Sequence, residues 1–489
     1  DRGVAMLHSY WFLIARRKFE EILKQDPTCA MAYWGVAMDL LGNTLATTPS
    51  RADVQAAWDA LEKARTIGAK TERERDYIAA IAAYYQGDGV PHAARVVAYD
   101  KAMAAVAEHS PGDHEAQIFH ALAILGVAYN SPPDKTYARQ KEAAKILNGL
   151  LPVEPQHPGI AHYVIHSFDY PELAELALPA ARAYARIAPS APHALHMPSH
   201  IFTRLGMWKE SIASNLASER TAQEWVAKTH AGATAFEALH AMDYLEYAYL
   251  QTGQDAKARD VADRVTKATS LDAPQFAAAY ALAAVPARNA LERRAWNEAA
   301  ALTVRPETFP WAKYPYAKAI VHFARAVGAA RSGSVEAARQ DVATLADIQS
   351  SLKGQKGFDW ATQVEIQRRA AAAWVAHAEK KDAEAVTLLR SAADLEDSTD
   401  KHPVTPGSVL PAREQLADLL AESGQPAKAL VEYEASLRSA PARLNSFDGA
   451  AKAAERAGKK KEAKAFRERL LALCDGTLPD RLLTKTAAH

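Results

Sequence analysis

Apolar residues recur every three or four positions along most of the chain, the spacing of amphipathic helices. Short breaks rich in proline, glycine, aspartate or asparagine separate these segments. They predict helices over about 52–67, 72–86, 91–107, 112–127 and 135–150. Thr71 and Glu74 have the spacing of a capping box at the start of one of them. We therefore expect an all-α chain.

A repeat of 34 residues organises the centre of the chain, because Pro155 and Pro189 are 34 positions apart and the following positions match as well. The same offset relates Pro158 to Pro192, His162 to His196, His166 to His200, and Phe168 to Phe202. Each of two consecutive repeats thus carries a His-x-x-x-His pair at the same point of its first helix. A period of this length indicates helical pairs that stack on one another.

The repeat also marks other parts of the chain. Gly424 and Gly458 are 34 residues apart and are expected to end equivalent helices. Gly253 follows Gly206 by 47 residues, which indicates an insertion of 13 residues in between. We expect four segments: 1–154 with N-terminal repeats, 155–268 with the histidine-rich repeats, 269–400 with alanine-rich helical pairs, and 401–489 with a repeat pair and a tail.

This pattern of 34-residue repeats resembles that of the tetratricopeptide repeat family across most of the chain. The resemblance implies an α-solenoid, a right-handed superhelix of antiparallel helix pairs in which the first helix of each pair lines a groove. The runs H-P-G-I-A-H-Y-V-I-H and H-A-L-H-M-P-S-H-I-F-T-R-L-G are similar to runs in a little-described bacterial branch of repeat proteins. That second resemblance implies a shared fold and a shared site without implying a reaction.

Family geometry implies which positions of each first helix face the groove. In one repeat these positions hold His193, His196 and His200; in the repeat before it, Gly159, His162 and His166; in the repeat after it, His240, Asp243 and Tyr247. Residues four apart lie on one face of a helix, so the two pairs are expected to lie side by side.

Four imidazoles in one groove suit zinc, copper, iron or nickel, because neutral imidazole is a good ligand for these metals. We predict a metal site of His162, His166, His196 and His200. Further ligands, or groups that hydrogen-bond the ligands, are expected from His193, His240, Asp243, Asp169 and His8. Two alternatives stay open: a polar groove that binds a ligand through histidines without metal, and a purely structural histidine network.

Pro198 lies between His196 and His200, where it would interrupt a helix. Either the helix begins at Pro198, or it begins near Pro192 and is kinked, and the match of Pro158 with Pro192 favours the second.

Composition and the absence of certain motifs argue against several classes of function. Lysine plus arginine and aspartate plus glutamate number 58 each, so no basic field attracts nucleic acid. The apolar run from Phe276 to Val285 is too short to span a membrane. There is no glycine-rich phosphate loop, so no nucleotide cofactor is expected, and no H-E-x-x-H motif of zinc proteases. The sequence begins at Asp1, so both a periplasmic or secreted location after signal removal and a cytoplasmic one stay open.

Two functions follow from these patterns. The first is a metal-binding repeat protein whose groove site performs metal-dependent chemistry, as a hydrolase or an oxidoreductase. The alternative is a scaffold that binds a peptide or protein without catalysis. The expected ligand is a small molecule or a peptide in the groove.

Overall fold

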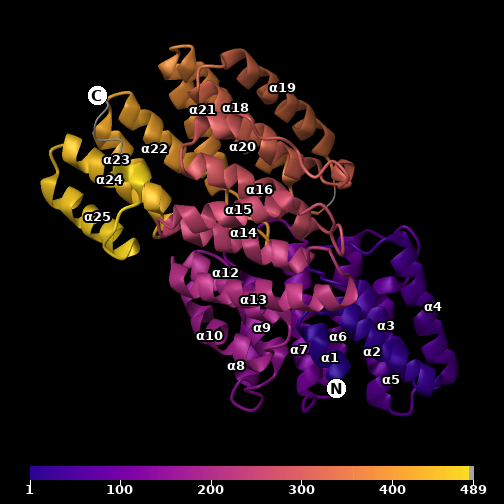
Figure 1. Cartoon of the computed structure of the whole chain (residues 1–489). Coiled ribbons are helices and arrows are strands. Elements are labelled where there is room, and N and C mark those ends of the chain that lie inside the picture. The colour runs from indigo at the N-terminus through magenta and orange to yellow at the C-terminus, as the bar shows by residue number, and fades with distance from the viewer. Residues whose placement is uncertain (356, 484–489) are drawn as a thin grey trace. The chain divides into compact units, whose positions relative to one another are not determined.

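A computed structural model describes residues 1–355 and 357–483 of the chain (Figure 1). A first compact unit comprises Asp1–Ile201, and a second begins at Phe202. The boundary falls inside the segment 155–268 that the repeat pattern groups together. The last residues of the expected tail, 484–489, lie outside the described part of the chain.

The first unit is built from helices joined by short connections. These helices are α1 (Arg2–His8), α2 (Phe12–Gln25), α3 (Ala30–Leu41), α4 (Arg51–Ile67), α5 (Glu72–Tyr85), α6 (His92–His109), α7 (His114–Tyr129), α8 (Ala138–Leu150), α9 (Pro158–Phe168), α10 (Leu178–Ile187) and α11 (Pro192–His196), with a 3₁₀ turn at Ala174–Ala177. Helix α12 (Pro198–Arg204) begins in this unit and ends in the next.

The second unit continues in the same manner. Its helices are α13 (Trp208–Thr229), α14 (Phe236–Gln251), α15 (Asp255–Lys267), α16 (Phe276–Glu292), α17 (Trp296–Ala300), α18 (Pro315–Arg331), α19 (Val335–Leu352), α20 (Trp360–Ala378), α21 (Asp382–Asp397), α22 (Ala412–Glu422), α23 (Pro426–Ser439), α24 (Leu444–Arg456), α25 (Lys460–Leu473) and α26 (Asp480–Leu483), with a 3₁₀ turn at Trp311–Lys313.

The packing confirms the expected all-α, tetratricopeptide-like architecture within each unit. Successive helices contact one another, and because their connections are short they form antiparallel hairpins. Alternate helices also contact one another at several places: α3 contacts α5, α7 contacts α9, and α14, α16, α18, α20, α22 and α24 form an unbroken series. This series is the inner layer of a stack of helix pairs. Among the described residues, extended pairing is limited to one isolated bridge between Thr234 and Leu271.

The helix boundaries follow the capping signals in the sequence. The five helices expected over residues 52–150 begin and end within three residues of their predicted limits. The capping box at the start of α5 is formed, since the Thr71 side chain accepts from the Glu74 backbone N–H and Glu74 accepts from the Thr71 backbone N–H. Within the described chain, no helix combines the length and the apolar character that crossing a membrane requires.

Gly424 and Gly458 end equivalent helices, as expected, with φ angles of 72° and 78°. A Cβ at either position would meet no atom within 4 Å, so only backbone strain opposes a side chain there. We expect Gly424→Val to destabilise the α22–α23 hairpin by about 1 kcal/mol or more, seen as faster amide hydrogen exchange in those helices. Gly149→Val, at an exposed position without a positive φ, is the control and lacks this strain. Unchanged exchange in α22 and α23 would contradict the expectation.

The segment between α21 and α22 is packed against the inner layer of the second unit. The Tyr244 hydroxyl on α14 donates to the carbonyl of Val404, and the Tyr280 hydroxyl on α16 donates to that of Gly407. His402 is buried against Phe276, with 4.3 Å between ring centroids. The rings of Phe358 and Trp360 enclose the same imidazole.

Candidate metal centre

Helix α9 presents the first histidine pair. Pro158 occupies its first turn, and the His157 side chain caps it by accepting the Gly159 backbone N–H. His162 and His166 lie one turn apart on one face, and both side chains are buried. Their Nε2 atoms are 3.1 Å apart. The sequence therefore places two imidazole nitrogens at one point through helical spacing alone.

Helix α11 supplies the third nitrogen. The Nε2 atom of His193 lies 3.2 Å from that of His162, and ligand nitrogens of His162, His166 and His193 all lie within 4.8 Å of one another. Helix α11 begins at Pro192, and Met197 keeps helical dihedral angles before α12 starts at Pro198. The helical path is thus interrupted in the middle, which agrees with the kinked alternative. We call His162, His166 and His193 the histidine trio.

The backbone of α1 fixes the orientation of His162. Its Nδ1 donates to the carbonyl oxygen of His8 at 2.5 Å, so in the neutral ring Nε2 carries the lone pair that faces His166 and His193. Burial lowers the pKa of His162 well below its usual range, and the neighbouring His166 lowers it further. Burial, followed by His162, does the same to the pKa of His193. Both rings are therefore held neutral, the form that binds metals.

The spacing of the histidine trio matches a tetrahedral metal site. With Zn–N bonds of about 2.0–2.1 Å, the nitrogens of a tetrahedral site are about 3.3 Å apart. The two separations of 3.1 and 3.2 Å that involve His162 are close to this value. The single lone pair of His162 Nε2 thus faces the ring nitrogens of both His166 and His193. The residues present therefore fit a borderline divalent metal with one coordination position left open.

The second histidine pair lies beside the trio. The Nε2 atoms of His196 and His200 are 3.1 Å apart, and the ring centroids of His166 and His200 are 6.2 Å apart. Asp169, which follows the last turn of α9, accepts from His200 Nδ1 at 3.0 Å. This is the carboxylate–histidine arrangement that orients imidazole ligands in metal sites. All four histidines of the predicted site thus lie in one buried cluster, with His193 completing the trio.

His8 serves a different network, although it was expected near the site. Its Nδ1 hydrogen-bonds with the Tyr163 hydroxyl at 2.8 Å, and its Nε2 binds Glu115. His157 Nε2 binds the other oxygen of Glu115 at 3.1 Å. Burial raises the pKa of Glu115, but the two histidines outweigh burial and hold that pKa below its usual range. Each ring nitrogen of His8 and His157 has a protein partner. We therefore infer that His8, Glu115 and His157 have a structural role, which is to join α1 and α7 to α9.

His240 and Asp243 lie on α14, in the second unit. Asp243 is buried and accepts from Arg288 Nη1 at 2.7 Å, while the same nitrogen reaches Glu246 at 3.2 Å. Burial raises the pKa of Asp243 even though Arg288 opposes that shift. His240 is buried with its ring edge-on to Tyr244. That these two residues complete the histidine site stays a prediction.

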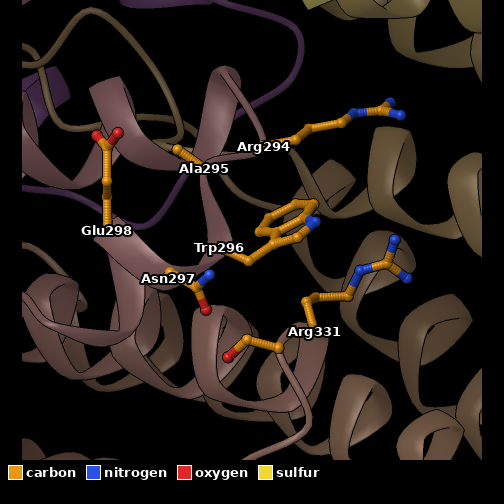
Figure 2. Close-up of a pocket in the computed structure, with 7 residues that line it drawn as sticks. Arg294, Ala295, Trp296, Asn297, Glu298 and Arg331 are labelled. Atoms are coloured by element: carbon orange, nitrogen blue, oxygen red, sulfur yellow. The ribbon is translucent and has the colours of Figure 1, made fainter. Parts of the chain in front are cut away.

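A pocket of about 440 Å³ opens in the second unit, at the turns that follow α16 and α18 (Figure 2). Figure 2 shows the Trp296 indole between Arg294 and Arg331. Both arginines form paired hydrogen bonds with carboxylates, Arg294 with Asp418 and Arg331 with Glu422. Since these charges are already matched and the lining holds no histidine or cysteine, the histidine cluster is the stronger candidate site.

Tyr10 is the neighbour that the repeat pattern does not predict. It follows α1 and places its buried ring against all three members of the trio. The sequence signal near it is the pair Tyr10 and Trp11 beside His8, which could face the groove or simply pack. That pair did not show which helix it packs against, because the contact with α9 joins residues more than 150 positions apart.

Comparisons with known proteins found neither a matching family model nor a matching curated protein. Solved structures with a likeness to the chain include a human IFIT1 dimer with m7Gppp-AAAA, at 13% identity and a TM-score of 0.41, covering 96% of this chain and 95% of that one. Yeast Tom70 matches at 13% identity and a TM-score of 0.36, covering 99% and 97%. The TPR domain of P58(IPK) matches at 12% identity and a TM-score of 0.23, covering 100% and 98%. Likenesses this distant say nothing about the ligand of this chain.

Proposed function

We propose that the first unit is a metal-binding module in which His162, His166 and His193 hold one divalent transition-metal ion. The observation that carries the proposal is the convergence of three imidazole nitrogens, two from the buried His162 and His166 and one from the half-buried His193, with separations of 3.1 and 3.2 Å about His162. Nitrogen-only ligands favour zinc, copper, nickel or iron over magnesium or calcium.

Three histidines leave one tetrahedral position for water or substrate, which is typical of catalytic rather than structural zinc sites. A metal held by these three histidines would supply the chemistry of a hydrolase, because it would polarise a carbonyl or phosphoryl oxygen and lower the pKa of bound water. A redox-active metal would support an oxidoreductase instead. The chain's own contribution is to keep His162 and His193 neutral through burial, and to orient His162 through the hydrogen bond to the His8 carbonyl.

The scaffold alternative has less support in the second unit. There the hydroxyls of Tyr244 and Tyr280, on inner helices, already bind backbone carbonyls of the chain's own segment between α21 and α22. An external peptide would have to displace this segment to reach the same hydroxyls. A peptide ligand is therefore a weaker proposal than a metal ion for this chain.

Element analysis of the full chain, purified without a histidine tag, tests the proposal. We expect about one transition-metal ion per chain, retained through gel filtration and removed by a strong chelator. Equilibrium dialysis of the stripped protein against Zn²⁺, Co²⁺, Ni²⁺ and Cu²⁺ should restore one ion. A chain that is isolated without metal and takes up none of these ions would contradict the proposal.

A further inference from the structure

Tyr10 lies at the centre of the histidine trio. Its ring centroid is 4.4 Å from that of His162, which it meets edge-on, and 5.3 and 5.9 Å from those of His193 and His166, against which it stacks. The residue is 8% exposed. One tyrosine from the N-terminal turn thus touches all three imidazoles to which we assign the metal.

The backbone at Tyr10 has a conformation that normally belongs to glycine. Helix α1 ends with Tyr10 N–H donating to Leu7 and Trp11 N–H donating to Met6, the pattern that places a left-handed residue just past the helix. Tyr10 has a φ of 52°. A bulky residue in this region is strained, and such strain gathers at functional sites. Five other non-glycine residues of the described chain also have a positive φ, so what distinguishes Tyr10 is the contact of its ring with the trio.

The Tyr10 hydroxyl has no hydrogen-bond partner among the residues that the structure describes, although the atom is buried. By contrast, the nearby Tyr163 hydroxyl, also buried, hydrogen-bonds with His8 Nδ1 at 2.8 Å. Leaving a buried hydroxyl unsatisfied costs free energy unless a ligand supplies the missing partner. The ring of Tyr10 thus contacts the three imidazoles, and its buried hydroxyl is a donor available to an acceptor bound at the metal.

We propose that the Tyr10 hydroxyl donates a hydrogen bond to a small anion or an oxygen-bearing substrate bound at the open coordination position. The inference rests on the metal site proposed above and specifies the class of ligand that would bind there. The ligand is small because the surroundings are closed by Tyr10, His162 and Tyr184, whose ring stacks on His162 at 5.3 Å. It carries a hydrogen-bond acceptor on or next to the atom that binds the metal. In this arrangement Tyr10 selects and orients the ligand and is not itself a metal ligand.

Azide binding to the Co²⁺-loaded full chain tests this role, because visible absorption bands of cobalt report the change in coordination. We expect Tyr10→Phe to bind Co²⁺ within about threefold of the wild-type affinity and to bind azide at least about tenfold more weakly, the loss expected for one hydrogen bond to a charged group. Tyr163→Phe is the matched control, because it removes a buried hydroxyl whose partner belongs to the protein. It should keep the wild-type azide affinity.

Two results would overturn the role of Tyr10 while leaving the metal site standing. One is an azide affinity of Tyr10→Phe equal to that of the wild type, and the other is a tenfold loss of Co²⁺ affinity in that variant, which would make the phenol a metal ligand. Failure of the proposed metal site looks different, because the wild-type chain would then show no cobalt bands at all, and both proposals would fall. Circular dichroism of Tyr10→Phe establishes that the variant is folded.

Discussion

The His162→Ala variant is expected to lose its bound metal, with an affinity for Zn²⁺ or Co²⁺ at least about a hundredfold below that of the wild type. His162 is the member of the histidine trio whose nitrogen lies within 3.2 Å of both others. It is also the one that the His8 carbonyl holds in the metal-binding tautomer. Changing a residue that only supports a ligand costs about ten- to a hundredfold in affinity, so removal of a ligand costs more. Metal content and equilibrium dialysis measure the loss.

Two controls make the result specific to the trio. His109→Ala combined with His230→Ala removes two exposed histidines and should keep the full affinity. His196→Ala combined with His200→Ala removes the neighbouring pair and leaves the trio intact, so it should keep one ion. Alanine favours helix, so the helices that carry these substitutions should be kept, and circular dichroism checks this. Full metal occupancy in His162→Ala would refute the assignment of the trio.

The fold was predictable because its signals are local. Helix ends follow caps and glycines, as at Thr71 and Gly424, and these depend on residues three or four positions away. The 34-residue period added the stacking of pairs, since equivalent positions of neighbouring repeats must meet. The pattern did not show that the segment between α21 and α22 packs against the inner layer, because proline and threonine are equally common in loose linkers.

The site was predictable only in part. Helical spacing was sufficient to bring His162 to His166 and His196 to His200, because each pair spans one turn. The choice of His193 for the trio depends on how α11 approaches α9, and the interruption before Pro198 alters that approach. The His8 carbonyl ends α1 and Tyr10 follows it, and no periodicity links this part of the chain to α9. Such long-range contacts follow from packing and cannot be derived from repeat spacing.

Acid is expected to open the segment that carries His402. Burial lowers the pKa of His402 from 6.5 to about 3, and the charge of Lys401 adds to the effect. The Val404 backbone N–H donates to His402 Nδ1, which requires an unprotonated nitrogen. In the open segment this imidazole regains its ordinary pKa, so below pH 6.5 the open form binds a proton that the closed form excludes. The closed form is thus fully stable above pH 6.5 and loses stability as the pH falls toward 3.

At pH 4.5 the loss amounts to about 2.7 kcal/mol, which is about a hundredfold in the opening equilibrium. We expect the hydrogen-exchange protection factors of the Val404 and Thr405 amides, corrected for the intrinsic pH dependence of exchange, to be about a hundredfold lower at pH 4.5 than at pH 7.5. His402→Gln, which stays neutral, should remove most of this pH dependence, whereas His230→Gln at an exposed position should keep it. The same acid sensitivity in wild type and His402→Gln would show that another group governs the segment. Because the Tyr244 and Tyr280 hydroxyls lose their carbonyl partners when the segment opens, acid should also expose the inner helices α14 and α16.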